Sequence, residues 1–386
     1  MQNFSFYNPT RIHFGKGSTD KLAEEMQSRG NNILLVYGGG SIKRNGLYQR
    51  VMQQLQGRNV IELAGVDPNP RLTSVHEGIR LCRQHKVDLI LGVGGGSAID
   101  CAKAIAIGVP YDGDVWDFFK GRAYPKAATP LGAILTLAAT GTEMNGNSVI
   151  TNTETTEKIG FAGVKLMHPQ FSILDPENTY TVPAEHLANG CVDMLSHLYE
   201  AYFSLPDDTP IQDGMAETIM RVVFDQAPLA LTDPTNYDVR AKLMWCGTMA
   251  LCDIVQLGMQ GDWGCHAIEH VISAHYDIAH GAGLAIITPA YMKFLCHAHP
   301  SKYRQYAINV FGIDPAGRTD LVVGLEGIAR TKEMFAKIGA PVSLRQVGIG
   351  EEKLDQMADE MLAGGSLGNY AKIGKPELMG ILRDML

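Results

Sequence analysis

The sequence lacks the features that mark secreted, membrane-spanning and nucleic-acid-binding proteins. Its seven cysteines are scattered, odd in number and without a CxxC spacing, which indicates reduced thiols in a cytoplasmic protein. No apolar run approaches the length of a membrane span, and the polar N-terminus MQNFSFYNPTR is unlike a signal peptide. An excess of positive charge is absent, since the formal net charge is −8, and this argues against binding to nucleic acid or to an anionic membrane.

The GxGxxG fingerprint of ordinary dinucleotide-binding domains is also missing. Instead, two apolar runs, NILLVY and VDLILGV, lead into glycine turns with the sequence GGGS at 38–41 and 94–97. A short run that is apolar on both faces is typical of a buried parallel strand. A glycine turn before a helix lets phosphate oxygens approach backbone N–H groups at the positive end of the helix dipole. We interpret the turns as phosphate-binding; tight turns without a ligand are the alternative.

Histidine is concentrated in one part of the chain, because residues 193–280 hold five of its twelve histidines. Asp193 and His197 stand four apart, as do His266 and His270, so on helices each pair would share one face. Imidazole and carboxylate groups are standard ligands of zinc and iron. Two such pairs on facing helices, with His280 nearby, predict a catalytic metal site without cysteine. A chance cluster of surface histidines is the alternative.

The pattern of the sequence changes near residue 180. Before it, apolar runs typical of strands, from 11–17 to 171–174, alternate with helical periodicities. After it, long helical periodicities follow one another. At 386 residues the chain is also too long for one ordinary core. We therefore predict an α/β dinucleotide-binding domain at 1–180 and an all-helical metal-binding domain at 181–386.

Two long stretches, SILDPENTYTVPAEHLANGCVDMLSHLYE at 172–200 and the histidine-rich stretch 264–283 ending in HGAG, resemble the signatures of one known family. GGGSAID at 94–100 and PNP at 68–70 match it too. The family is the iron-containing (group III) alcohol dehydrogenases, whose fold is related to that of dehydroquinate synthase. YGGGSIKRNG, TGTEMN, ANGCVDMLSH and QGDWGCHAIEH are most similar to its butanol dehydrogenase and NADPH-dependent aldehyde reductase branch.

The resemblance implies a metal-ligand set that differs from the one spacing alone would choose. The implied ligands are Asp193, His197, His266 and His280. His270 then lies beside the metal, in a position suited to proton relay or to orienting the substrate. His275 is expected to be solvated or structural.

The resemblance also implies which residues bind the cofactor. Gly95, Gly96 and Ser97 would hold the pyrophosphate, and Asp100 would cap or orient that helix turn. At Gly39, the family members that prefer NAD have an aspartate, so glycine followed by Ser41 and Lys43 favours NADP(H) over NAD(H). The predicted cofactor-binding residues are Gly38, Gly39, Ser41, Asn69, Gly95, Gly96, Ser97, Asp100, Thr136, Thr140 and Lys158.

The predicted function is hydride transfer between NADP(H) and a small alcohol or aldehyde, such as butanol or butyraldehyde, assisted by one Fe(II) or Zn(II) ion. An NAD-dependent glycerol-type dehydrogenase and a dehydroquinate-synthase-like lyase are the alternatives. A lyase needs cations for its anionic substrate, and 262–284 contains no Lys or Arg. A sensor that binds cofactor without turnover is a third alternative. A homodimer that pairs through an edge strand at 11–14 is also expected.

Overall fold

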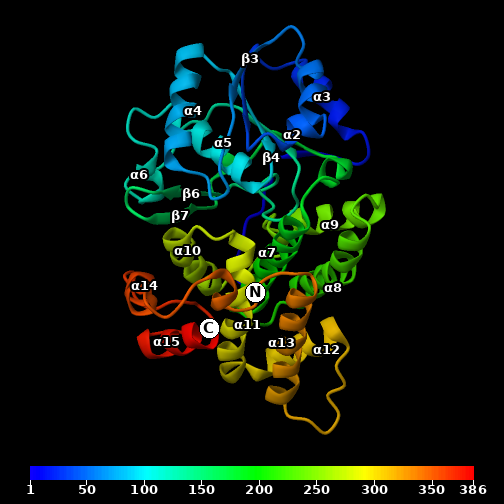
Figure 1. Ribbon diagram of the computed structural model, residues 1–386, viewed down its shortest axis with the longest axis vertical. Coiled ribbons are helices and arrows are strands. Elements are labelled where there is room, and N and C mark those ends of the chain that lie inside the picture. Colours follow the sequence, from blue (N-terminus) through cyan, green and yellow to red (C-terminus); the bar gives the residue numbers. More distant parts are fainter. The chain divides into compact units, whose positions relative to one another are not determined.

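The computed structural model describes residues 1–386, and the chain divides into two compact units (Figure 1). The α/β unit comprises Tyr7–Val182 and Pro234–Thr248. The helical unit comprises Met1–Phe6, Pro183–Asp233 and Met249–Leu386. The main division therefore falls close to the predicted boundary at 180. A single boundary at 180 would assign residues 1–6 to the α/β unit and residues 234–248 to the helical unit. In the structure each of these two segments belongs to the opposite unit.

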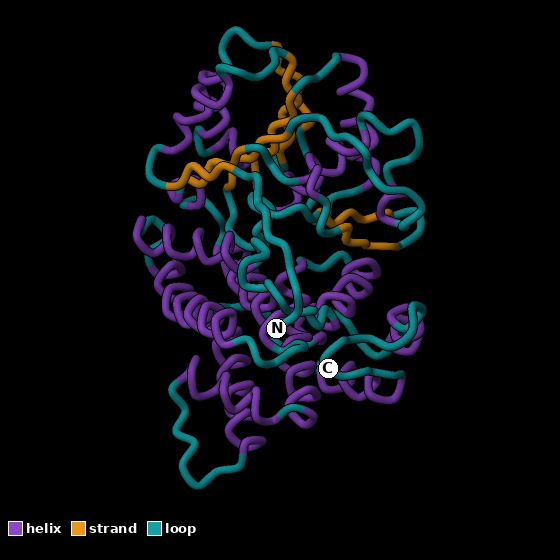
Figure 2. The backbone as a smooth tube through the Cα atoms, turned by 180° about the vertical axis from the view of Figure 1, so that it is seen from behind, coloured by secondary structure: helices purple, strands orange, loops and turns teal.

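The α/β unit is built on a six-stranded parallel sheet with the strand order β1-β8-β5-β4-β2-β3. Its strands are β1 (Arg11–Phe14), β2 (Asn32–Tyr37), β3 (Asn59–Leu63), β4 (Leu89–Gly94), β5 (Leu131–Leu135) and β8 (Phe171–Leu174). A separate antiparallel hairpin joins β6 (Ser148–Asn152) to β7 (Glu157–Phe161), and the sequence of 148–161 by itself predicts a hairpin. Every strand belongs to this unit, and the tube in Figure 2 shows the strands gathered in one part of the chain.

Helices cover both faces of this sheet. The helices of the α/β unit are α1 (Lys21–Met26), α2 (Ser41–Arg44), α3 (Leu47–Gln54), α4 (Leu72–His85), α5 (Gly96–Gly108), α6 (Trp116–Phe119) and α9 (Tyr237–Ala250), with 3-10 turns η1 (Ser18–Asp20), η2 (Lys165–Met167) and η3 (Pro176–Thr179). Leu34 and Val36 of β2 pack in one core with α4 and α5, whereas Ile33 and Leu35 pack in a second core with α1 and α3. Burial on both faces explains why β2 is an unbroken apolar run.

The helical unit is arranged around α7, which is buried along its length from Leu187 to Tyr202. α7 packs against α8, α10 and α11, and α11 packs in turn against α13 and α15. The helices are α7 (Ala184–Tyr202), α8 (Pro210–Thr232), α10 (Gly264–Tyr276), α11 (His280–Ala298), α12 (Pro300–Phe311), α13 (Asp320–Lys337), α14 (Leu354–Met361) and α15 (Lys375–Asp384), with the 3-10 turn η4 (Leu344–Val347). None of the helices is long and apolar enough to cross a bilayer.

The predicted fold class is confirmed, and the differences concern individual helices. Helical periodicity over 237–257 predicts one helix, but α9 ends at Ala250, and in the turns that follow Asp253 adopts a left-handed φ of 73°. Helical periodicity over 283–295 predicts another helix, and α11 begins earlier, at His280. α15 was not predicted, although its start carries a proline in the first turn and a glutamate, Glu377, that accepts from the N-cap backbone N–H.

Candidate metal and nucleotide sites

Three helices of the helical unit bring most of the predicted metal ligands together. Asp193 lies on α7, His266 in the first turn of α10, and His280 at the first position of α11. These three residues offer ligand atoms that all lie within 4.8 Å of one another. The Nε2 atom of His280 is 3.6 Å from Oδ1 of Asp193. Residues that are far apart in sequence therefore converge on one point.

His197, the fourth predicted ligand, lies at the edge of this group. Its Nδ1 atom is 3.6 Å from Oδ1 of Asp193, one helical turn away on α7. Its ring stacks on that of His266, with centroids 4.8 Å apart. Burial lowers the pKa of His197 to about 3, although the carboxylate of Asp193 works in the opposite direction. The imidazole is therefore neutral at physiological pH and keeps the lone pair that a metal ligand needs.

The hydrogen-bonding state of these atoms tests whether the residues fit a metal ion. Asp193 Oδ1, His197 Nδ1 and His266 Nε2 are all buried, and none has a hydrogen-bond partner. Burying polar atoms without partners is costly, so such atoms are rare in native structures. A divalent cation would satisfy all three at once, and carboxylate plus imidazole is a donor set that suits iron or zinc. The residues therefore fit the metal.

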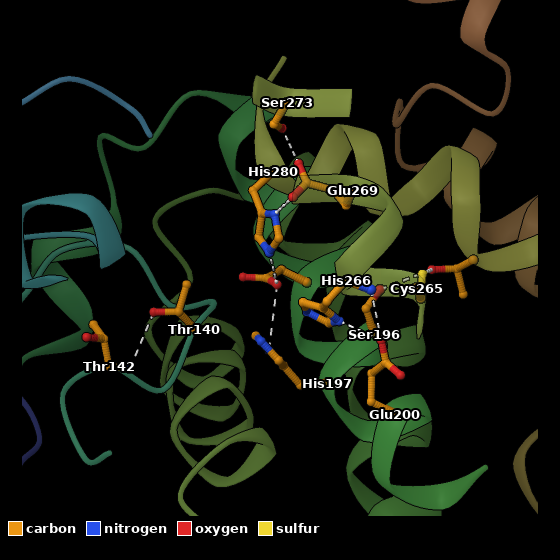
Figure 3. A network of polar contacts seen from close by, with 12 residues as sticks. Thr140, Thr142, Ser196, His197, Glu200, Cys265, His266, Glu269, Ser273 and His280 are labelled. Carbon is orange, nitrogen blue, oxygen red and sulfur yellow. Dashed lines mark hydrogen bonds and ion pairs between the residues drawn. The ribbon is translucent and has the colours of Figure 1, made fainter. Parts of the chain in front are cut away.

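Two buried glutamates that the sequence analysis did not single out contact the histidines (Figure 3). Glu200 Oε1 accepts from Nδ1 of His266 at 2.8 Å and from the backbone N–H of the same residue at 3.0 Å. Glu269 accepts from Nδ1 of His280 and from the hydroxyl of Ser273. A sequence signal for Glu200 exists, because it follows Asp193 and His197 in an i, i+4, i+7 pattern on one face of α7.

The glycines of the HGAG sequence allow this arrangement. A Cβ atom on Gly281 would overlap the backbone carbonyl of Asn189 on α7, and one on Gly283 would lie 2.9 Å from Cγ of Glu269. The start of α11 therefore approaches α7 and α10 more closely than any side chain would permit. These glycines position His280.

His270 lies close to the cluster without joining the first group. Its ring centroid is 5.8 Å from that of His280, and it is half-buried. His270, His280 and Glu269 form a second group whose possible ligand atoms lie within 4.8 Å. Because Glu269 already accepts from His280 and Ser273, the group containing Asp193 fits a metal better. His275 pairs with Glu360 at 2.6 Å.

In the α/β unit, the predicted cofactor residues follow the carboxyl ends of neighbouring parallel strands, where ligands of open α/β sheets bind. Gly38, Gly39 and Ser41 follow β2, and Asn69 lies in the turn after β3. Gly95, Gly96 and Ser97 follow β4, and Thr136 and Thr140 follow β5. No side chain caps the N-terminus of α5 at Gly95, so its backbone N–H groups stay available to an anion. A Cβ on Gly96 would lie 2.9 Å from Oγ1 of Thr140.

Two of the predicted cofactor residues, Asp100 and Lys158, do not directly follow a strand of the parallel sheet. Asp100, which was predicted to cap or orient the helix turn, accepts through its carboxylate from Oγ1 of Thr142 at 2.6 Å and from the backbone N–H of Val149 at 2.9 Å. It therefore fixes the loop after β5 and the start of β6 against α5. Lys158 lies on the hairpin strand β7 and is buried.

Lys43, which was expected to favour a 2′-phosphate, is paired with a carboxylate. Its Nζ atom is 3.2 Å from Oε2 of Glu62 on β3, and it lies over the rings of Tyr37 and Tyr48. Glu62 also accepts from the hydroxyl groups of both tyrosines. Gly39 is exposed, and a Cβ there would meet nothing within 4 Å.

Comparison with known proteins matches two family descriptions to the chain. "Iron-containing alcohol dehydrogenase" matches residues 9–176, and "Fe-containing alcohol dehydrogenase family, C-terminal" matches residues 187–386. The chain belongs to the iron-containing alcohol dehydrogenase family. The resemblance inferred from the sequence is thereby confirmed.

Relatives within this family match along nearly the whole chain. The probable NADH-dependent butanol dehydrogenase 1 of Bacillus subtilis is 47% identical, with 100% of both chains covered. The NADPH-dependent aldehyde reductase YqhD of Escherichia coli is 37% identical over 90% of each chain. The crystal structure of NADH-dependent butanol dehydrogenase A from Thermotoga maritima superposes with a TM-score of 0.95 at 41% identity, covering 100% of this chain and 99% of that one.

Proposed function

We propose that the chain is a metal-dependent oxidoreductase that transfers a hydride between a nicotinamide dinucleotide and a small alcohol or aldehyde of the butanol and butyraldehyde type. The observation that carries this proposal is the convergence of Asp193, His266 and His280. Buried ligand atoms of Asp193, His197 and His266 have no hydrogen-bond partner in the protein, which a bound metal ion would explain. Family membership and the names of the relatives support the same reaction class.

Asp193, His197, His266 and His280 would hold the metal, which would act as a Lewis acid toward the oxygen of the substrate. The dinucleotide would supply or accept the hydride. His270, beside His280, is placed to hold a proton for the substrate oxygen or to orient the substrate. Gly95 and Gly96 leave the N-terminus of α5 open to the pyrophosphate.

The proposed substrate is small and uncharged. The stretch 262–284 of the helical unit carries no lysine or arginine that could hold a carboxylate or phosphate. Trp263 precedes α10 with its ring 5.5 Å from that of His266, and it is partly exposed. Its indole would form an apolar wall for a short alkyl chain. Iron and zinc both suit the donor set, and we propose Fe(II) or Zn(II) as the active ion.

We propose that NADP(H) and NAD(H) are both accepted, with a small preference for NADP(H). The open position at Gly39 supports acceptance of a 2′-phosphate, because no acidic side chain stands there. The pairing of Lys43 with Glu62 weakens the attraction for that phosphate. Five relatives at 41–49% identity carry NADH in their names, and one at 37% carries NADPH. The preference is therefore expected to be weaker than the sequence alone predicts.

We also propose a cytoplasmic homodimer. All seven cysteines are buried and none is part of a disulfide, as expected for thiols in a reducing compartment. β1 forms one edge of the sheet and pairs only with β8, so its other side offers unpaired backbone groups to a second copy of the chain.

Butyraldehyde reduction with NADPH and with NADH, compared on one preparation, tests the reaction. The protein would be stripped of metal and reloaded anaerobically with Fe(II) or Zn(II). We expect metal-dependent turnover with both cofactors and a modestly higher kcat/KM for NADPH. The absence of turnover with every combination, on protein that binds the metal, would contradict the proposed reaction.

A further inference from the structure

We infer that Glu200 and Glu269 are positioning residues that orient two of the metal-binding histidines, each from a neighbouring helix. This inference rests on the proposed metal site. It concerns groups that would not touch the ion themselves. It assigns a role to two buried carboxylates that the reaction does not otherwise require.

The contact between Glu200 and His266 selects the ring atom that faces the cluster. Nδ1 of His266 donates to Oε1 of Glu200 at 2.8 Å, and the backbone N–H of His266 donates to the same oxygen. The proton is therefore on Nδ1, which leaves a lone pair on Nε2. That Nε2 atom is buried without a hydrogen-bond partner. Glu200 thus fixes both the tautomer and the rotation of the ring.

Glu269 makes the equivalent contact with His280, and Ser273 supports it. One carboxylate oxygen of Glu269 pairs with Nδ1 of His280, and the other accepts from the hydroxyl of Ser273 one turn further along α10. The hydroxyl of Ser273 also lies 3.2 Å from the carbonyl of Ile278. Nε2 of His280 consequently points toward Asp193, at 3.6 Å. Gly283 leaves room for the Glu269 side chain, since a Cβ there would crowd its Cγ.

The two contacts link three helices in order. Glu200 of α7 holds a histidine of α10, and Glu269 of α10 holds a histidine of α11. The third link joins α11 to α7, because Nε2 of His280 lies 3.6 Å from Oδ1 of Asp193. His197 differs, because its Nδ1 atom has no hydrogen-bond partner, and the carboxylate near that atom belongs to Asp193, itself a predicted ligand. We therefore assign orienting carboxylates to His266 and His280 but not to His197.

The glutamates also change the charge of the site. A divalent ion and the single ligating carboxylate of Asp193 together carry +1, and Glu200 and Glu269 place two further acidic side chains beside the histidines. Both glutamates are buried, at 3% and 0% exposure. Buried carboxylates are costly without a compensating cation, so the bound ion stabilises them as they stabilise it. Their removal should weaken metal binding even though every ligand remains.

Glu200→Gln and Glu269→Gln test this in the full-length protein, with Glu217→Gln as the matched control. Glu217 is also a buried carboxylate of the helical unit, but it accepts from Tyr202 and Asn309 and contacts no predicted ligand. The measurements are the zinc dissociation constant by chelator competition, the visible absorption spectrum of the Co(II)-loaded protein and the melting temperature of the metal-free protein.

We expect each of the two variants to raise the dissociation constant by roughly 10–100-fold and to shift the Co(II) spectrum, while Glu217→Gln changes neither. Wild-type affinity and an unchanged spectrum, with a lowered melting temperature of the metal-free protein, would show a purely structural role and overturn the inference. Failure of the wild-type protein itself to bind zinc or cobalt would instead contradict the proposed metal site. Should Glu269→Gln fail to fold, Ser273→Ala must still weaken binding, and an unchanged affinity in that variant would overturn the role of Glu269.

Discussion

The carboxylate of Glu62 lies 3.2 Å from the ammonium group of Lys43, beside the glycine turn that follows β2. Lys43 was predicted to attract a 2′-phosphate, but its positive charge is already paired with the carboxylate of Glu62. We expect Glu62→Gln to free this cation and to raise the ratio of kcat/KM for NADPH to that for NADH by about tenfold, which corresponds to about 1.4 kcal/mol. Steady-state kinetics with butyraldehyde measures the ratio.

The control is Glu77→Gln, which breaks a similar exposed pair with Arg80 on α4. It should leave the ratio unchanged.

Gly39→Asp should lower the ratio of kcat/KM for NADPH to that for NADH, because an acidic side chain there has open space and would repel a 2′-phosphate. If neither Glu62→Gln nor Gly39→Asp changes the ratio, the 2′ position lies elsewhere.

Loss of a ligand should separate metal binding from proton handling. Asp193→Ala and His280→Ala are expected to abolish turnover and to lower the metal content measured after dialysis, because each removes a member of the converging group. His270→Ala should keep the metal while lowering kcat. His275→Ala, which breaks only the pair with Glu360, is the control and should retain both. Full activity of His280→Ala would remove that residue from the ligand set.

The close approach of α11 to α7 can be tested at Gly281. A methyl group there would overlap the backbone carbonyl of Asn189, so Gly281→Ala should destabilise the metal-free protein by about 1–3 kcal/mol in denaturant melts and weaken zinc binding. Gly214→Ala on α8 is the matched control. A Cβ at that position meets nothing within 4 Å, and alanine should be neutral or stabilising by up to about 1 kcal/mol. Equal free energies of unfolding for Gly281→Ala and Gly214→Ala would mean that α11 can shift away from α7 without a cost in stability.

Stability should depend on pH through Glu25, which joins α1 to β1. Burial raises the pKa of Glu25, but hydrogen bonds from Arg29, His13 and Arg11 outweigh it and hold this pKa at about 2, below its ordinary value of 4.5. The carboxylate therefore stabilises the fold fully above pH 4.5, and this contribution is lost as the pH falls toward 2.

Glu25→Gln should accordingly cost up to about 3 kcal/mol at pH 7, with a difference from wild type that shrinks between pH 4.5 and 2. Urea melts over this pH range measure it. The neighbouring Glu24→Gln, at an exposed position paired only with Lys21, should change little. A difference for Glu25→Gln that stays constant with pH would assign its effect to packing instead.

The proposed dimer can be tested at the edge of the sheet. The backbone N–H of Arg11 donates to the carbonyl of Gln170, just before β8, and that of Gly15 donates to the carbonyl of Leu174, the last residue of β8. Because successive N–H groups of a strand point to opposite sides, the N–H of Ile12 points away from β8. Ile12→Pro would remove this outward donor while sparing the pairing with β8. Light scattering should give a dimer for wild type and for Ile12→Ala, and a monomer for Ile12→Pro. A monomeric wild-type protein at micromolar concentration would show the dimer prediction to be wrong.

The parallel sheet and the histidine cluster could be predicted because their signals are local. The run NILLVY before a glycine turn, and the pair Asp193 and His197 at helical spacing, each show their structure within a few residues. The roles of Glu62, Glu200 and Glu269 could not be predicted so directly. Each depends on a partner from another element, and a glutamate within a helix or strand is by itself an ordinary surface residue. Asp100 illustrates the same limit, since its true partners Thr142 and Val149 lie more than forty residues away.

The way the chain passes between its two units limits how it could be divided. It crosses from one unit to the other after Phe6, Val182, Asp233 and Thr248, because α9 belongs to the α/β unit although helical-unit segments flank it in sequence. α9 is held there by Thr248, which donates to buried Glu143, and by Trp245, whose ring meets that of Phe14. A truncation that begins at Pro183 would carry α9 without these partners. A single cut therefore leaves neither half with the complete set of segments that make up its unit.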